Sequence, residues 1–83
     1  MPLFVYEATN ADLKERFVGV SHVPPRRLEG LNRSERPEFG LSWDFARHTI
    51  RYHMLMETTS KSQADAFAWE FRRATPMPGW KLL

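Results

Sequence analysis

Two short apolar runs joined by a polar turn occupy residues 3–21. Residues 4–6 (Phe-Val-Tyr) and 17–20 (Phe-Val-Gly-Val) are rich in aromatic and β-branched side chains, which favour a pleated, half-buried strand. Residues 9–12 (Thr-Asn-Ala-Asp) supply turn chemistry, because Asn and Asp side chains bond to their own backbone in tight turns. The connection is longer than a two-residue turn, so the pattern predicts an antiparallel hairpin with a looser loop and strands near 3–8 and 15–20.

A third strand is predicted over residues 48–57, where apolar and polar side chains alternate. Successive side chains of a strand point to opposite faces. One face would therefore be apolar, with Ile50, Tyr52, Met54 and Met56. The other would be mostly polar, with Thr49, Arg51, His53 and Leu55. This pattern is typical of a sheet that helices cover on one side.

Two helices are predicted, near residues 24–31 and 61–74. Ser21 could cap the first helix, whose initial turn tolerates two prolines because their missing N–H groups would lack a helical partner there. Ser60 and Gln63 have the spacing of a capping box for the second helix. Its buried stripe would be Ala64, Phe67, Ala68 and Phe71. A short helical turn capped by Ser42 could lie between these helices.

Length and composition limit the class of protein. With 83 residues and 42% hydrophobic content, the chain predicts one domain, 1–83, of α+β class with a three-stranded, mostly antiparallel sheet. There is no cysteine, which excludes disulfides and thiolate metal sites. No apolar run reaches the roughly 18 residues of a membrane span, and no signal-peptide pattern precedes the first strand. We therefore expect a cytoplasmic protein without a membrane partner.

The hairpin and the residues after it resemble the start of a GIY-YIG nuclease domain. A Val-Tyr pair at 5–6 stands for the first motif of that family and Phe-Val-Gly at 17–19 for the second. Arg27, in an Arg-Arg pair, stands where the family has an arginine on its first helix. The order of strand, strand, helix, strand and helix agrees with that fold over nearly the whole chain.

The resemblance also implies a catalytic site. It assigns Tyr6 as the base, Arg27 as the cation for developing charge, and Glu70 on the last helix as the ligand of Mg²⁺ or Mn²⁺. Phosphodiester cleavage needs all three groups around one reacting phosphate. A single carboxylate with water ligands is ordinary for Mg²⁺.

Several residues depart from the family pattern and leave the function open. Phe4 replaces a glycine, Phe17 replaces the tyrosine of the second motif, and Leu31 replaces a histidine. The asparagine that usually follows the last helix has no counterpart. One interpretation is an endonuclease with weak or lost activity. Another is a non-catalytic module that binds DNA or RNA through arginines, namely Arg26, Arg27, Arg47 and Arg51. A third is a small interaction protein that uses Trp69 and the C-terminal tail.

Overall fold

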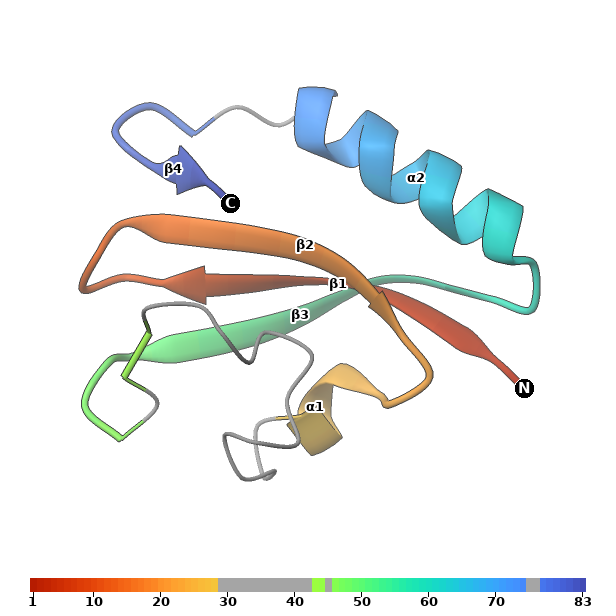
Figure 1. The fold of residues 1–83 in the computed structure, drawn as a ribbon, viewed down its shortest axis with the longest axis horizontal. Helices are drawn as coiled ribbons and strands as arrows, with labels where there is room; N and C mark the ends of the chain where they lie inside the picture. Colours follow the sequence, from red (N-terminus) through yellow and green to blue (C-terminus); the bar gives the residue numbers. More distant parts are fainter. Residues whose placement is uncertain (29–42, 45, 75–76) are drawn as a thin grey trace.

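A mixed four-stranded sheet with the strand order β3-β1-β2-β4 forms the centre of the fold (Figure 1). The computed structural model describes residues 1–28, 43–44, 46–74 and 77–83. The strands are β1 (Leu3–Asn10), β2 (Glu15–Ser21), β3 (Ile50–Thr58) and β4 (Lys81–Leu82). The helices are α1 (Pro25–Leu28) and α2 (Lys61–Ala74). The expected α+β class is confirmed, and no helix among these residues is long and apolar enough to cross a membrane.

The sheet differs from the expected three-stranded one in its fourth strand. β1 pairs antiparallel with β2, as the hairpin pattern predicted, and it also pairs antiparallel with β3. The C-terminal residues add β4, which runs parallel to β2. The backbone amides of Lys81 and Leu83 donate to the carbonyl oxygens of Lys14 and Arg16, both at 2.8 Å. Two residues are too few for a strand pattern to be read from the sequence.

A β-bulge in β3 changes the face of the sheet to which the apolar side chains of this strand point. Val5 of β1 pairs with Met56, but the next residue, Tyr6, pairs with Met54, so that Leu55 is the extra residue. Tyr52 therefore packs with Tyr6, whereas Met56 packs with Val5. The predicted single apolar face is correct as far as Met54 and wrong for Met56, because the bulge shifts the alternation by one residue.

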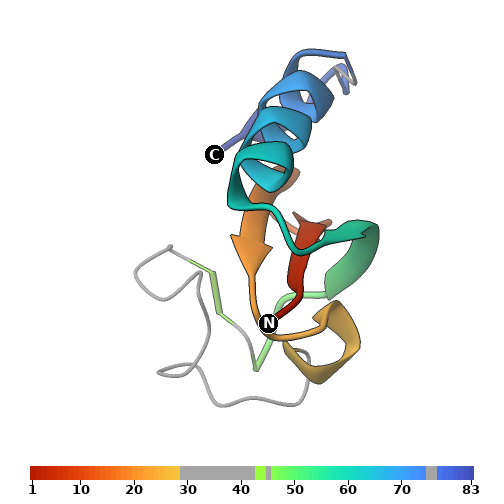
Figure 2. The same ribbon diagram turned by 90° about the vertical axis from the view of Figure 1, so that its right-hand side faces the viewer.

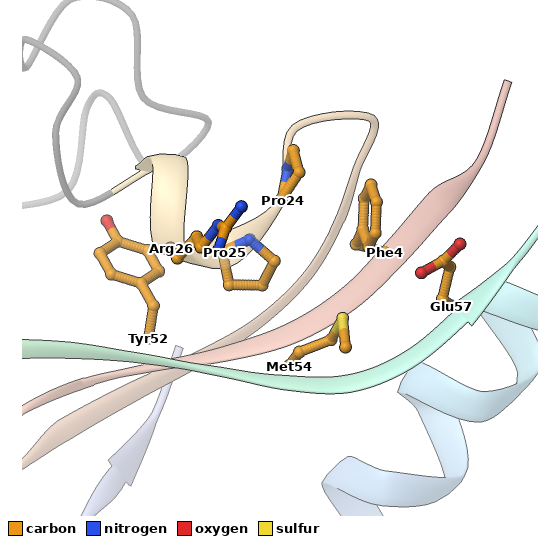
Figure 3. A pocket seen from close by; sticks show the side chains of 7 residues that line it. All are labelled: Phe4, Pro24, Pro25, Arg26, Tyr52, Met54 and Glu57. Carbon is orange, nitrogen blue, oxygen red and sulfur yellow. The ribbon is translucent and has the colours of Figure 1, made fainter.

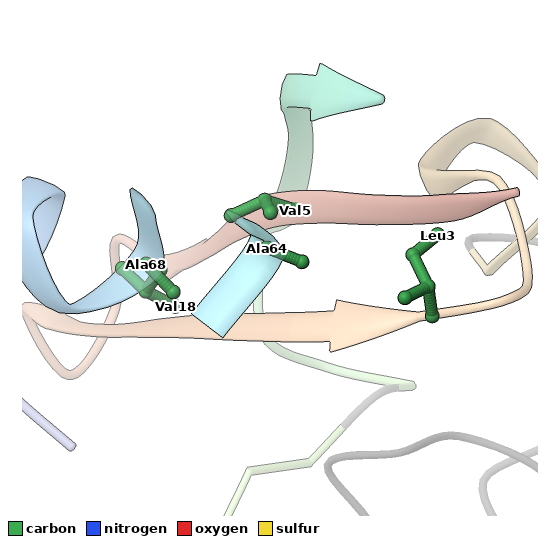
Figure 4. Close-up of a cluster of buried hydrophobic side chains, with 5 residues drawn as sticks. All are labelled: Leu3, Val5, Val18, Ala64 and Ala68. Atoms are coloured by element: carbon green, nitrogen blue, oxygen red, sulfur yellow. The ribbon is translucent and has the colours of Figure 1, made fainter. Parts of the chain in front are cut away.

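Each face of the sheet has its own core. On one face α2 packs against β1 and β2 (Figure 4), through Leu3, Val5, Val18, Ala64 and Ala68. On the other face α1 helps to cover a second cluster, which consists of Tyr6, Ala8, Leu28, Trp43 and Tyr52. The two helices lie at opposite ends of the molecule with strands between them (Figure 2). Ala64 and Ala68 have small side chains, so α2 can approach the sheet closely at these positions.

The helix ends agree only in part with the expected caps. Gln63 N donates to Ser60 Oγ at 3.3 Å, as in a capping box, but the Gln63 side chain accepts a bond from Thr58 Oγ1 instead of reaching back to Ser60 N. Ser21 does not cap α1: its Oγ accepts from Val23 N, and the first helical bonds go to Pro24 O. The predicted residues 29–31 of this helix and the turn at Ser42 lie outside the described residues.

A buried ion pair lies on the α2 face near the helix C-terminus. Arg16 Nε donates to Glu7 Oε2 at 2.8 Å, and the Arg16 guanidinium lies 5.7 Å from the centre of the Phe71 ring. The two side chains are only 3% and 13% exposed, respectively. Because charges are costly to remove from water, this pair contributes to the fold as a unit rather than as two separate side chains.

Candidate nucleic-acid interface

The two family-like motifs meet at the centre of the α1 face. The Tyr6 ring is completely buried, with its centre 6.2 Å from that of Phe17 and 6.0 Å from that of Tyr52. Its cross-strand partner is Gly19. A Cβ atom at Gly19 would lie 2.7 Å from Tyr6 Oη and 2.6 Å from Phe17 Cε1, distances too short for any side chain. The glycine of the second motif therefore has a packing reason: it makes room for two aromatic rings.

Helix α1 presents two arginines to solvent beside this cluster. Leu28 and Pro25 are buried and attach the short helix to the sheet, whereas Arg26 and Arg27 between them are exposed. The helix begins after Pro24, whose carbonyl oxygen accepts the amides of Arg27 and Leu28 at 2.9 and 3.2 Å. The helix therefore presents two consecutive arginines to solvent.

Glu70 does not join the other residues assigned to the catalytic site. It is exposed on α2, where it borders a shallow hollow with Met56, Gln63, Ala66 and Phe67. Tyr6 and α1 belong to the other face of the sheet. The three residues that a metal-dependent cleavage would need in one cleft are thus separated by the sheet. The reason is the packing of α2, whose apolar stripe covers the Val5 side of β1.

The other two arginines predicted to bind nucleic acid belong to other parts of the fold. Arg47 is exposed in the turn before β3, with its Nε 3.8 Å from Asp44 Oδ2. Arg51 is exposed on β3, and its neighbour Tyr52 faces α1, so the Arg51 side chain points to the opposite face of the sheet. Of the four predicted arginines, Arg26 and Arg27 are thus consecutive exposed residues of α1, whereas Arg51 belongs to the other face.

The described residues offer little for a metal ion. No group of three or more His, Cys, Asp or Glu side chains among them could hold one. Mg²⁺ or Mn²⁺ at Glu70 would therefore depend on that carboxylate, the neighbouring Gln63 amide and water. Such a donor set is poorer than the pairs of carboxylates and substrate phosphates that usually hold Mg²⁺.

A pocket between α1 and β3 was not foreseen from the sequence. It has a volume of about 560 Å³, and Arg26 of α1 is one of the residues that line it. Figure 3 shows Tyr52, Met54 and Phe4 rising from the sheet towards Pro24 and Pro25, with α2 on the far side of the sheet. The alternating pattern of β3 placed Tyr52 and Met54 on one face of the strand. It did not indicate that Pro24 and Pro25 would lie opposite them and form a pocket.

No protein-family model, curated protein or solved structure matches this chain. The arrangement of its own residues is therefore the basis on which a function can be assigned.

Proposed function

We propose that this protein is a divergent GIY-YIG-like domain that binds DNA or RNA through its α1 face without cleaving it. The observation that carries the proposal is the division of the motif residues. Tyr6, Phe17 and the arginines of α1 lie on one side of the sheet, and Glu70 lies on the other. The arginines that could contact a phosphate backbone lie on one face of the sheet, whereas the residues that cleavage of the phosphodiester bond would require are divided between both faces.

The arginines of α1 support the binding half of the proposal. A guanidinium is a planar fork of donors that matches phosphate oxygens, and it stays charged at any physiological pH. Arg26 and Arg27 are adjacent, exposed and carried by a helix whose flanking residues are buried, so their backbone is fixed. The net charge of the chain is only +2, which favours modest affinity that depends strongly on salt.

The burial of Tyr6 supports the non-catalytic half. A general base must come within hydrogen-bond distance of the water that it deprotonates. Tyr6 has no exposed surface, and Phe17 beside it lacks a hydroxyl group. Glu70 cannot supply a metal to the same phosphate from the opposite face. Cleavage would require the sheet or α2 to rearrange.

Binding is tested by fluorescence anisotropy with labelled single- and double-stranded oligonucleotides. If Arg26 and Arg27 each neutralise one phosphate, raising the salt from about 50 to 200 mM should weaken binding about tenfold. The double variant Arg26→Gln/Arg27→Gln should bind more weakly and lose most of this salt dependence. Arg73→Gln, which removes an exposed arginine on α2, is the matched control and should behave like the wild type. Equal binding by the double variant and the wild type would refute the proposed surface.

Cleavage is tested by plasmid nicking in Mg²⁺ or Mn²⁺ with the wild type, Glu70→Ala and Phe17→Tyr. We expect no metal-dependent nicking by any of them, because restoring the hydroxyl at position 17 does not bring Glu70 to the α1 face. Nicking by the wild type that Glu70→Ala abolishes and Phe17→Tyr increases would replace this proposal with an endonuclease.

A second candidate function, protein binding, is favoured by one observation. Trp69 is 57% exposed on α2, as its position off the apolar stripe predicted, and large aromatic side chains are frequent anchors of protein interfaces. If the wild type binds no nucleic acid at low salt, this becomes the preferred function, with Trp69→Ser as the variant to compare in binding experiments.

A further inference from the structure

Most of the described residues that line the pocket between α1 and β3 are apolar. They contribute two aromatic rings, two proline rings and a thioether, namely Phe4, Tyr52, Pro24, Pro25 and Met54. Met54 is 57% exposed, whereas Tyr52, two residues before it on the same face of β3, is buried. A flat ligand with apolar faces would cover these surfaces. Nucleic-acid bases have such faces, and every kind of base can stack on an aromatic side chain.

Two charged side chains complete the lining of the pocket. Arg26 enters it from α1 and Glu57 from the end of β3 (Figure 3). Glu57 faces this side only because of the bulge at Leu55: in a regular strand, residues 54 and 57 would point to opposite faces. Among the described residues neither side chain forms an ion pair. The pocket therefore offers one donor group and one acceptor group around an apolar floor.

The Glu57 carboxylate selects among bases by its hydrogen-bonding capacity. An ionised carboxylate has two acceptor oxygens and no donor, so it is matched by two neighbouring N–H groups. Guanine presents such a pair, N1–H and N2–H, on its Watson–Crick edge, whereas the same edge of adenine places an acceptor at N1. Arg26 can bind the phosphate of the same nucleotide, since guanidinium and phosphate are complementary in charge and shape.

We propose that this pocket binds an unpaired guanine of a single-stranded nucleic acid, with Glu57 on the Watson–Crick edge and Arg26 on the phosphate. The inference rests on the proposed function and gives it a substrate class. The base must be unpaired, because the edge that Glu57 contacts is occupied in a duplex. The α1 face then binds single strands that contain guanine more tightly than duplexes of the same sequence.

The location is tested with the mononucleotides 5′-GMP and 5′-AMP. In protein labelled at the methionine methyl groups, 5′-GMP should shift the NMR signal of Met54, and 5′-AMP should shift it less. Met1 is exposed but lies outside the pocket, so its signal is the internal control. An unchanged Met54 signal at saturating 5′-GMP would overturn the proposal.

The base preference is tested by anisotropy with pyrimidine oligonucleotides that carry one guanine, one inosine or one adenine at the centre. A good two-bond contact to a base supplies a discrimination of about tenfold or more, so the guanine strand should bind at least that much more tightly than the adenine strand. Inosine keeps N1–H and lacks the amino group, so its affinity should be intermediate.

Glu57→Gln should remove the preference for guanine, because the amide of Gln offers one donor and one acceptor, which match N1 and N6–H of adenine instead of N1–H and N2–H of guanine. Glu57 is exposed, so the variant should fold, which a thermal melt checks. Glu70→Gln is the matched control on the opposite face and should keep the preference. Equal affinity of the wild type for the guanine and adenine strands overturns the pocket assignment while the proposed function stands. Failure of the wild type to bind any strand overturns both.

Discussion

Gly19 has little room for a larger residue. Its substitution by alanine would place a Cβ atom 2.6 Å from Phe17 Cε1 and 2.7 Å from Tyr6 Oη. Overpacking of this kind costs about 1–3 kcal/mol, so Gly19→Ala should lower the free energy of unfolding by that amount. Urea denaturation measures it.

The control for Gly19→Ala is a second substitution at Tyr6, whose ring lies against Gly19. In Tyr6→Leu/Gly19→Ala the hydroxyl and the far end of the ring are gone, so the cost of the alanine should be smaller than in the wild-type background. Full additivity of the two changes would mean that the clash with Tyr6 does not exist.

The Glu7–Arg16 pair makes a separate prediction for a single residue. Glu7→Gln would leave the Arg16 guanidinium, whose side chain is 3% exposed, without its carboxylate. Breaking a buried pair from one side typically costs about 3–5 kcal/mol, whereas replacing both partners by apolar residues is often neutral. We therefore expect Glu7→Gln to be far less stable in urea than Glu7→Leu/Arg16→Met. The opposite order would show that the pair does not act as a unit.

Between elements, Asn10 connects the β1–β2 loop to the turn before β3. Its side chain is completely buried, and Oδ1 accepts the amides of Asp12 and Leu13 at 3.1 Å. Its Nδ2 lies 2.9 Å from His48 Nδ1, which also accepts the Asp44 amide at 2.9 Å. The Asn10 Nδ2 group has only N–H donors, so Asn10 donates and His48 Nδ1 accepts in this contact.

This connection predicts a coupling between two loops that are distant in sequence. Asn10→Ala should cost about 2 kcal/mol, because it removes two hydrogen bonds that a completely buried side chain makes to the amides of Asp12 and Leu13. His48→Ala should cost less, and the double variant should cost less than the sum of the two. A double-mutant cycle in urea measures this coupling. Strict additivity would contradict a bond between Asn10 and His48 in solution.

For the molecule as a whole, the central position of β1 sets the order of folding. β1 pairs with β2 across a short loop, but its pairs with β3 join residues as far apart as Leu3 and Thr58. Closing a long loop costs entropy before distant contacts can form. In chevron kinetics Val18→Ala should therefore slow folding, whereas Met56→Ala should mainly accelerate unfolding. Reversed assignments would place the β1–β3 pairing first.

The same division between local and distant contacts explains what the sequence could predict. The hairpin, the strand at 50–58 and α2 were predicted within a few residues, because alternation, helical spacing and turn residues are local patterns. The bulge at Leu55, the strand at Lys81 and the separation of Glu70 from Tyr6 were not. Each depends on which face a helix or tail packs against, and side-chain spacing along one segment does not contain that information.

The site was predictable to the same degree. Arg26 and Arg27 could be placed together because they are neighbours on one short helix. The pocket could not be foreseen, since its walls come from β1, α1 and β3, and the position of Glu57 depends on the bulge.

The bulge in β3 also bears on how copies of this protein behave towards one another. Within the described residues β3 forms one edge of the sheet, and a long regular edge strand is a template for sheet extension and aggregation. The extra residue Leu55 interrupts the regular row of donors and acceptors on that edge, and the exposed charges of Arg51 and Glu57 flank it. One inserted residue thus makes this edge a poorer template for self-association along the strand.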